Sequence, residues 1–516
     1  MAFGYIGHIL WRDRNQSFHP EDPLVVDNGL GADVKFTFID VIPGVLKKPP
    51  AGFPAKRESI AYHSFSALVA ACNEWLAKNT DWEVINCETI LLFFKFEDNG
   101  WQLAPQDTCF HLDGDAHSSL MALSIMIKRM DVLNTNSLCL NKNTFAKRDK
   151  TRVIVTQLWI KRRDIDVING GTNGNELGGN EANVANSSSE TTHQTICYAD
   201  FKPEKDDDDD TTRFEKLETV IDRANKSIRE GNVKGTPITI ETLYFPANSD
   251  WEIDPEATLH VFPGKCVSII RLFYISGADN CTEQIGIRDF TPKLLTGGGL
   301  FKKPSFENLS GTMSRASDWL ANNGSLEFKN AQCLEIKVKN YKHIETNSMS
   351  HSSDRGDYLR IFRVAYTKRP TDSVQDTPDS LRPDDSNTFS PRSIFLSSVI
   401  FTPADRETSL TQIKRKLHDW VDKAIKDIRF EGANPGSQKP RLLSAETVEI
   451  FCRQFSEEDI KGETENTFQY NRIGTINCFL FMAFRVYFDV GQVGRTFRSR
   501  SVASTASRKT DSCKVL

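Results

Sequence analysis

The chain of 516 residues is long enough for roughly two to four domains, and its apolar and charged fractions, 39% and 26%, are those of a globular protein. The formal net charge of -5 argues against a protein that binds nucleic acid along its whole surface. The longest apolar stretch, residues 479–484, is far shorter than the roughly 18 residues that a bilayer-spanning helix needs, so we expect no transmembrane helix.

The N-terminus and the cysteines together predict the cellular compartment. The opening MAFGYIGHILW has no basic flank and no small-residue cleavage site, and it carries Ala2 where myristoylation needs glycine. The 11 cysteines are scattered singly, with no Cys-x-x-Cys pair, as suits a reducing cytosol. We therefore expect a cytoplasmic protein that is neither secreted nor myristoylated.

An amphipathic helix followed by a strand, residues 64–95, introduces a pattern that occurs four times. The four predicted helices share a spaced set of mostly apolar residues: Phe65, Cys72, Trp75 and Leu76; Leu217, Ala224, Ser227 and Ile228; Leu309, Ala316, Trp319 and Leu320; Leu410, Leu417, Trp420 and Val421. The strands that follow share a short motif: Glu88-Thr89-Ile90, Glu241-Thr242-Leu243, Gln332-Cys333-Leu334 and Glu446-Thr447-Val448. The tryptophans on these helices are predicted to be core residues.

Two further strands frame each unit. The strand before each helix ends at a proline: Pro43, Pro203, Pro292 and Pro403. The last strand carries a related pattern in every unit: Gln157-Leu158-Trp159-Ile160, Arg271-Leu272-Phe273-Tyr274, Arg363-Val364-Ala365-Tyr366 and Arg485-Val486-Tyr487-Phe488. The match is weakest in the first unit. A second echo, between residues 101–108 and 251–258, supports the same alignment of units.

These patterns predict an α+β protein of four strand-helix-strand-strand repeats, each with one helix packed on a small antiparallel or mixed sheet. Such a unit leaves one sheet face uncovered, so the units are expected either to pair into two lobes or to form a single ring. Polar, low-complexity stretches mark the linkers. The predicted division is 1–168, repeat 1 with a long insertion; 169–193, flexible linker; 194–280, repeat 2; 281–367, repeat 3; 368–392, disordered linker; 393–490, repeat 4; 491–516, basic tail.

One segment has metal-ligand chemistry. Two imidazoles and two carboxylates fall within seven residues: His111, Asp113, Asp115 and His117. These groups could bind zinc or manganese. In a loop they are more often simply solvated, and no H-E-x-x-H motif or thiolate partner supports a metal site, so we expect no cofactor.

The repeated Glu-Thr pair invites a catalytic interpretation, because a carboxyl group can act as a general acid or base. The third unit replaces the pair with Gln332-Cys333, however, and a structural role would itself produce repetition in every unit. The structural interpretation is therefore favoured.

The last residues, Cys513-Lys514-Val515-Leu516, fit a C-a-a-X prenylation box in which Leu516 favours geranylgeranyl. The tail from Gly491 holds six cations and one anion, Asp511, giving 6 - 1 = +5. The cations are Arg495, Arg498, Arg500, Arg508, Lys509 and Lys514. One prenyl chain binds a membrane only marginally, and a polybasic neighbour adds about 1 kcal/mol per cation at an anionic leaflet.

This tail resembles the hypervariable ends of Ras-superfamily GTPases. The resemblance covers only the final residues, and no G-x-x-x-x-G-K-[ST] phosphate loop occurs in the sequence, so it does not imply GTPase activity. Serines among the arginines could be phosphorylated, which would weaken attraction to a membrane.

The leading hypothesis is a non-enzymatic scaffold or binding module, tethered to the cytosolic face of an anionic membrane by prenylated Cys513 and its basic neighbours, with no nucleic-acid partner. The alternative is an enzyme, or a protein that binds a small molecule or metal between its repeats, with His111, Asp113, Asp115 and His117 as the candidate ligands.

Overall fold

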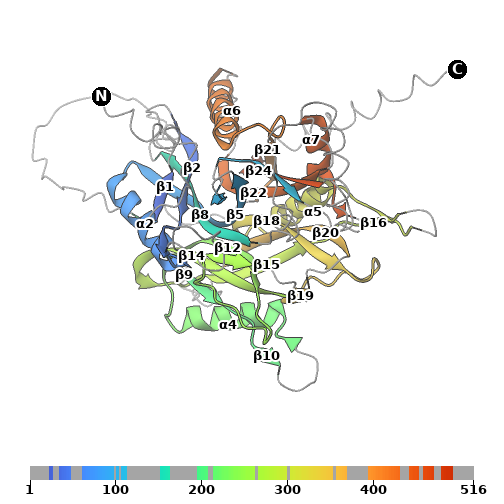
Figure 1. The fold of residues 1–516 in the computed structure, drawn as a ribbon, viewed down its shortest axis with the longest axis horizontal. Helices are drawn as coiled ribbons and strands as arrows, with labels where there is room; N and C mark the ends of the chain where they lie inside the picture. Colours follow the sequence, from blue (N-terminus) through green and yellow to red (C-terminus); the bar gives the residue numbers. More distant parts are fainter. Residues whose placement is uncertain are drawn as a thin grey trace, which may run out of the picture.

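The computed structural model describes residues 23–26, 34–47, 61–97, 100–103, 106–112, 151–162, 194–206, 213–261, 265–298, 303–352, 356–368, 393–430, 441–452, 457–469 and 478–491. In these residues four small antiparallel sheets form a propeller-like ring around a common centre, which Figure 1 shows face-on. We call the sheets blades 1 to 4, in chain order. The prediction of an α+β fold with four repeated units is confirmed at this level, and a single ring replaces the alternative of two lobes.

Each blade has an outer, a middle and an inner strand. In that order they are β2 (Phe36–Ile42), β8 (Thr151–Arg162) and β5 (Trp82–Glu97) in blade 1; β9 (Ile196–Phe201), β14 (Lys265–Asn280) and β12 (Lys234–Pro246) in blade 2; β15 (Gln284–Phe290), β20 (Asp357–Lys368) and β18 (Leu326–Val338) in blade 3; β21 (Leu396–Phe401), β24 (Cys478–Asp489) and β22 (Arg441–Cys452) in blade 4. The four inner strands contact one another in sequence around the axis. In blade 1, β1 (Leu24–Val26) pairs with β2 and β6 (Gly100–Leu103) with β5.

Each blade is completed by a short strand from the next unit. These strands are β13 (Leu259–Val261) on β8, β19 (Ser350–Ser352) on β14, β23 (Phe468–Gln469) on β20 and β7 (Cys109–Leu112) on β24. The last of them comes from the first unit, so it closes the ring. The two segments that echo each other in sequence lead directly into β7 and β13, which hold equivalent places.

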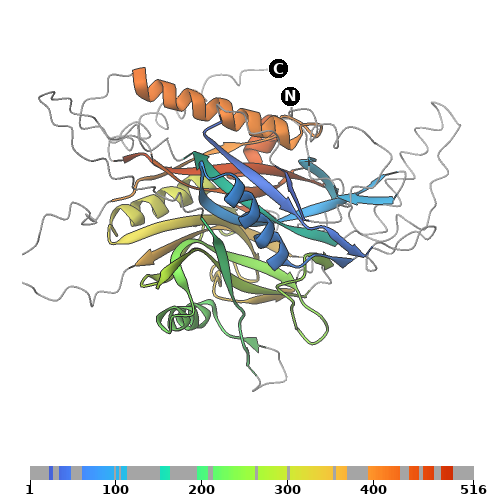
Figure 2. The ribbon, with the colours of Figure 1, turned by 90° about the vertical axis from the view of Figure 1, so that its left-hand side faces the viewer.

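Four helices lie in the interfaces between neighbouring blades, spread around the rim of the ring (Figures 1 and 2). They are α2 (Phe65–Lys78) between blades 1 and 2, α4 (Leu217–Arg229) between 2 and 3, α5 (Leu309–Ala321) between 3 and 4, and α6 (Leu410–Phe430) between 4 and 1. A fifth, α7 (Glu457–Glu465), packs on β22. Each interface helix thus contacts two sheets instead of covering one alone. None of the described helices is both long and apolar enough to cross a membrane.

Separate apolar cores fill the four blade interfaces. The core between blades 1 and 2, for example, combines Phe65 and Trp75 of α2 with Leu158 of blade 1 and Phe273 of blade 2. Strands are consequently buried on both faces, as β2 is at all seven of its residues. The predicted core tryptophans are confirmed as core residues, Trp75 being buried and the other two partly buried.

Three small hairpins project from the ring between an outer strand and the following helix, and Figure 1 shows β10 and β16 at its edge. They are β3 (Val45–Lys47) with β4 (Ala61–Tyr62), β10 (Lys205–Asp206) with β11 (Arg213–Phe214), and β16 (Leu294–Thr296) with β17 (Ser305–Phe306). Both predicted linkers lie outside the described residues, except for Lys368 at the end of β20. The tail beyond Gly491 lies outside them as well.

Candidate functional site

A row of three residues crosses each blade from the outer to the inner strand, at the level of the Glu-Thr motif. The rows are Asp40, Gln157 and Glu88; Asp200, Arg271 and Glu241; Asp289, Arg363 and Gln332; Ile400, Arg485 and Glu446. Three rows have an arginine in the middle and two have a carboxylate on both sides of the middle residue. The rows place most of the buried charge of the described ring in one layer.

In blades 2 and 3 the arginine is held by the outer-strand aspartate. Arg271 Nε and Nη2 donate to the two oxygens of Asp200 at 2.7 Å each, and Arg363 binds Asp289 in the same way at 2.6 and 2.7 Å. Arg271, whose side chain is 0% exposed, also donates to the carbonyl oxygen of Pro255 at 3.1 Å. Bidentate pairing satisfies several donors of a guanidinium that has lost its contact with water.

Blade 4 has no outer carboxylate, because Ile400 takes the place of the aspartate. Arg485 turns to the inner strand instead, where Nη1 donates to Glu446 Oε1 at 3.2 Å and to Cys333 Sγ of blade 3 at 2.7 Å. Burial raises the pKa of Cys333 to about 12, so this sulfur belongs to a neutral thiol. Tyr487 Oη donates a further bond to Glu446 Oε1 at 2.5 Å. One oxygen of this carboxylate, Oε1, therefore accepts from two buried donors.

In blade 1 the outer aspartate, Asp40, is present, but Gln157 takes the place of the arginine. Gln157 Nε2 donates to Asp40 Oδ1 at 2.8 Å, and the positive charge comes from Lys414 of α6, whose Nζ lies 3.8 Å from Asp40 Oδ2. Lys414 Nζ also donates to the carbonyl of Phe38 at 3.1 Å and lies 3.8 Å from the centre of its ring. Burial raises the pKa of Asp40 even though Lys414 and Gln157 act to lower it.

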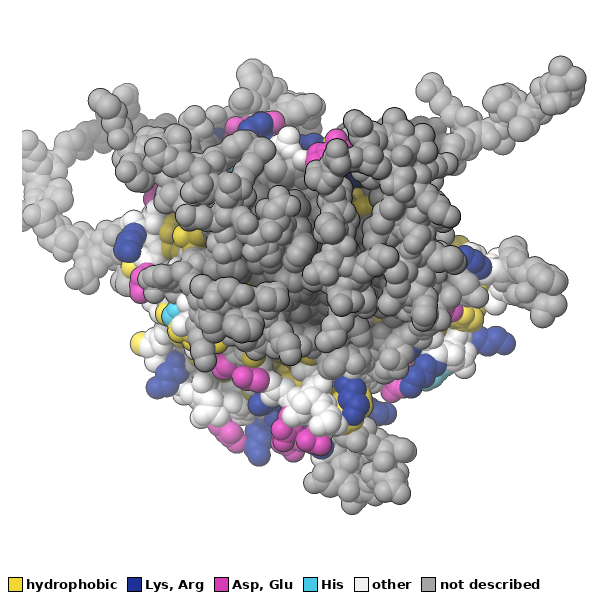
Figure 3. All heavy atoms as spheres, in the orientation of Figure 1, with side chains coloured by type: hydrophobic (Ala, Val, Ile, Leu, Met, Phe, Trp, Pro, Cys, Tyr) yellow, Lys and Arg dark blue, Asp and Glu magenta, His cyan; other side chains and the backbone are white. Residues whose placement is uncertain are grey.

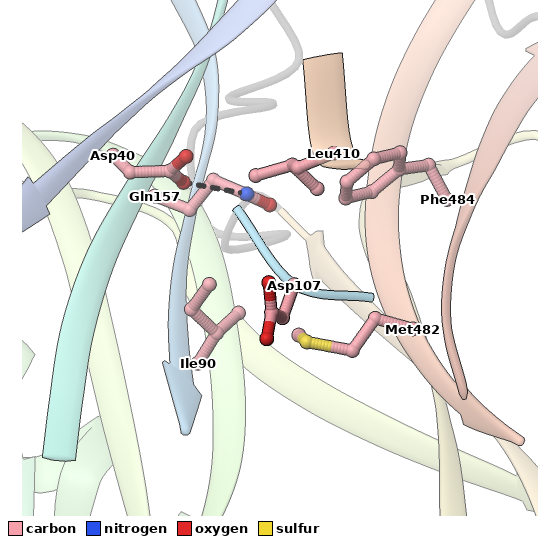
Figure 4. A pocket seen from close by; sticks show the side chains of 7 residues that line it. All are labelled: Asp40, Ile90, Asp107, Gln157, Leu410, Met482 and Phe484. Carbon is pink, nitrogen blue, oxygen red and sulfur yellow. Dashed lines mark hydrogen bonds between the residues drawn. The ribbon is translucent and has the colours of Figure 1, made fainter. Parts of the chain in front are cut away.

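A small pocket lies beside this row, between blades 1 and 4 (Figure 4). Its lining residues are Asp40, Ile90, Asp107, Gln157, Leu410, Met482 and Phe484. In blade 2 the Arg271 guanidinium lies 3.6 Å from the ring centre of Phe65, and Leu410 is the counterpart of Phe65 in α6. The pocket is therefore next to the space that the longer arginine side chain fills in blade 2. It has room for about one water molecule.

At the axis, the inner-strand residue of each row bonds to the neighbouring blade. Its side-chain oxygen accepts a hydrogen bond from the backbone N–H one position beyond the equivalent residue of that blade. The four bonds run from Thr89 N to Glu241 Oε1 (2.9 Å), Thr242 N to Gln332 Oε1 (2.8 Å), Cys333 N to Glu446 Oε2 (2.8 Å), and Thr447 N to Glu88 Oε1 and Oε2 (2.8 and 2.9 Å). The Glu-Thr pair thus links neighbouring blades by hydrogen bonds, which agrees with its structural interpretation.

A second polar layer lies two residues nearer the start of the inner strands. Asn86 Nδ2 donates to the carbonyl of Ala445 at 2.5 Å, and Asn86 Oδ1 accepts from the hydroxyl of Thr239. Asn330 exchanges two bonds with the backbone of Ile240, at 2.9 and 3.1 Å. Buried amides are satisfied here by the next blade, as buried polar groups require.

Two of the acids at the axis, Glu88 and Glu241, have raised pKa values. Burial raises the pKa of Glu88 well above its usual range; Glu241 and Glu446 raise it further, while the Thr447 N–H lowers it. Burial also raises the pKa of Glu241 to about 7, against the lowering effect of its bonds to Thr89. Repulsion between neighbouring carboxyl groups therefore adds to burial in disfavouring the ionised form of Glu88.

The metal candidate is not tested by the structure. His111 lies on β7, opposite Phe479 of blade 4, whereas Asp113, Asp115 and His117 lie outside the described residues. Within the described ranges, no group of three or more His, Cys, Asp or Glu side chains could hold a metal ion. Cys513 and the six tail cations also lie outside the described residues, so lipidation stays a prediction.

Sequence reasoning missed the pairing of Asp40 with Lys414 and the pocket beside it. The signal was present in the imperfect first-unit motif, where Gln157 replaces the arginine of the other three units. The compensating lysine could not be identified, because Lys414 comes from a helix more than 370 residues away in the chain from Asp40.

Placing the blade 2 arginine in blade 1 tests whether Lys414 supplies the positive charge that Gln157 lacks. Val69 is the α2 counterpart of Lys414. Lys414→Val alone should cost about 3–5 kcal/mol of unfolding free energy, because it leaves Asp40 buried without a cation. Gln157→Arg alone places a guanidinium beside Lys414. The double variant should be more stable than the two single effects predict, by about 0.5–3 kcal/mol in a cycle measured by urea unfolding.

The matched control combines Gln157→Arg with Lys416→Val, two positions further along α6. Lys416 Nζ donates to the carbonyl of Thr402. The effects of this second pair should add within about 0.5 kcal/mol. Simple additivity in both pairs would show that Lys414 does not compensate for the missing arginine.

Comparison of the chain with protein-family models, curated proteins and solved structures gave no match.

Proposed function

We propose that this chain is a non-enzymatic scaffold or binding module, tethered to the cytosolic face of an anionic membrane by a prenyl group on Cys513 and the basic tail. The observation that best supports the scaffold role is that the acids at the axis bond one blade to the next. These acids are the candidates for a general acid or base, but each accepts a hydrogen bond from the next blade: Glu88, Glu241 and Glu446. The pocket between blades 1 and 4 has room for about one water molecule and is too small for a larger ligand.

The projecting hairpins are the proposed contact points for partner proteins. Leu46 and Leu295 are the large apolar side chains most exposed among the described residues, at 61% and 64%. Each stands three residues after the proline that ends an outer strand, on opposite blades of the ring. A rigid ring that displays loops at fixed spacing suits a scaffold, since binding residues are often placed on loops that a firm framework positions.

The tether would supply attraction to a membrane. On the face seen in Figure 3, the described Lys and Arg side chains are interspersed with Asp and Glu. The tail carries +5, from six cations and one anion. A polybasic segment contributes about 1 kcal/mol per cation at an anionic surface, enough to make a single prenyl chain an effective anchor.

Cys513→Ser is the direct test of the tether. In cells that carry out prenylation, the wild type should float with membranes, and the variant should move to the supernatant, because the tail charge alone binds weakly and reversibly. Ser512→Ala, one residue earlier, is the matched control and should stay with membranes. A wild type that is found in the supernatant and whose intact mass shows no isoprenoid would refute the tether.

A further inference from the structure

In blades 2, 3 and 4 a cation of the interface helix bonds to a carbonyl group at the end of the outer strand. The cation stands at the same place in each helix, and the carbonyl belongs to the residue just before the proline that ends the strand. The bonds run from Arg223 Nη2 to the carbonyl of Lys202, from Arg315 Nη2 to that of Thr291 at 2.6 Å, and from Lys416 Nζ to that of Thr402 at 3.1 Å. A helix side chain therefore occupies the outer edge of three blades.

Blade 1 is built differently at this edge, because Ala71 is the α2 counterpart of Arg223. Strand β1 lies there instead, beside β2 and α2 (Figure 1). Its three residues pair with the end of β2: Leu24 with Ile42, Val25 with Val41 and Val26 with Asp40. Val25 and Ala71 pack against the same apolar core between blades 1 and 2. The small side chain of Ala71 thus leaves room for a strand where the other blades have a long cation.

The contact made by β1 is small. The strand has only three residues, all of them half-buried. Pro23 comes directly before it and has no N–H group with which to extend the pairing. Residues 27–35 join β1 to β2, so β1 holds its place at an effective concentration on the order of 1 mM, as a short link provides. A strand that pairs over a longer stretch can therefore compete with it.

We propose that the outer edge of blade 1, at residues 40–42, is a docking site for an extended aliphatic strand of a partner protein, and that β1 is the exchangeable strand that fills this site in the free chain. Pairing of an extended peptide with a sheet edge is a general mode of recognition, in which backbone bonds supply affinity and alternate side chains supply specificity. The inference rests on the proposed scaffold role but not on the membrane tether.

The chemistry of the partner strand follows from that of β1. The place of Val25 requires an aliphatic side chain, because it faces the core between blades 1 and 2. The pairing is antiparallel, so residues ahead of the place of Leu24 would lie beyond Ile42, on the side where the chain continues into β3. Leu46 of β3 is 61% exposed there. We expect a partner strand without proline at the place of Pro23 and with apolar residues ahead of it.

A labelled peptide tests the site directly. The probe carries Thr-Val-Thr in place of Glu21-Asp22-Pro23, followed by the natural residues 24–28, Leu-Val-Val-Asp-Asn. Its binding to the full chain, produced without prenylation, is measured by fluorescence anisotropy. Val25→Asp puts a charge into an apolar contact and should release the chain's own β1. The affinity for the probe should then rise at least about tenfold over the wild type, because the tethered competitor is removed.

Ala71→Arg tests whether this edge is where the probe binds. The new arginine can donate to the carbonyl of Ile42 as Arg223 does to that of Lys202, so it should occupy the site. Added to Val25→Asp, it should lower the affinity for the probe at least about tenfold, because the probe and the arginine compete for one acceptor. Ala70→Arg is the matched control, since Ala70 is exposed, and it should leave binding unchanged.

Three results would overturn the proposal. The first is equal binding of the probe to the wild type and to Val25→Asp. The second is binding that Ala71→Arg leaves unchanged. The third is weaker binding to Val25→Asp than to the wild type, which would show that the probe adds to β1 instead of replacing it. Val25→Gly, which removes the same contact without adding a charge, serves if Val25→Asp fails to fold.

The strand site and the tether can fail separately. The binding measurement uses the chain without its prenyl group, so its outcome does not depend on Cys513. Flotation of the Cys513→Ser variant, in turn, does not depend on β1. Loss of the first result with the second intact would leave a tethered scaffold that meets its partners elsewhere.

Discussion

Replacing Arg271 with methionine is expected to lower the free energy of unfolding by about 3–5 kcal/mol, because it leaves a carboxylate buried without its cation. Asp200 would lose both 2.7 Å bonds, and Pro255 would lose a donor to its carbonyl. Methionine can occupy much of the same space, so little of the loss would come from packing. Urea unfolding followed by circular dichroism measures the effect.

Two companion variants separate charge from structure. Adding Asp200→Asn to Arg271→Met should recover part of the loss, because it removes the uncompensated charge. Arg288→Met, on an exposed position of β15, should change stability by no more than about 0.5 kcal/mol. A loss below about 1 kcal/mol for Arg271→Met would mean that the rows contribute little to the ring.

Trp159→Ala should lower the free energy of unfolding by about 3–5 kcal/mol and should weaken the interface between blades 4 and 1 in particular. Trp159 is fully buried, and its ring lies 5.6 Å from Phe36, 4.7 Å from Phe38 and 5.6 Å from Phe484 of blade 4, measured between centroids. The cavity left behind would loosen the packing between blades 1 and 4. Hydrogen–deuterium exchange should therefore show early loss of protection in β7 and β24.

Trp319→Ala is the comparison for this prediction. Trp319 is only partly buried in the core between blades 3 and 4, beside Phe290 at 5.8 Å. Its loss should cost less and should raise exchange in β15 and β20 instead. Equal effects of both substitutions on β7 would argue against a special role for Trp159 in the interface between blades 4 and 1.

The alignment of the four units could be predicted from the sequence, because each unit carries polar residues at matching places in otherwise apolar strands. The arginine of the last strand, or Gln157 in unit 1, and the glutamate or glutamine of the strand after each helix were aligned by pattern. The structure places these residues opposite each other, as with Arg363 and Gln332. A row of charged residues inside apolar strands gives a strong signal. The repetition of the Glu-Thr pair, and its replacement by Gln332-Cys333 in unit 3, identified the pair as structural.

The short strands that complete each blade could not be predicted in the same way. β13 and β19 have three residues each, too few to show the alternation that identifies a strand. The helix positions were also beyond reach, because an amphipathic pattern shows that a helix has an apolar face but not how many sheets that face contacts. Long-range compensation, as between Lys414 and Asp40, leaves no local trace at all.

The position of β7, a strand of unit 1, in blade 4 has a consequence for folding during synthesis on the ribosome. Residues 109–112 emerge early, but β24, which they join, ends only at Asp489. At ordinary elongation rates of roughly 5–20 residues per second, the first unit must wait about 20–75 seconds for its acceptor to be made. During that interval a strand with open backbone groups is exposed to other nascent chains. The final unit, by contrast, can pair with β7 as soon as β24 is complete, because β7 has already been synthesised.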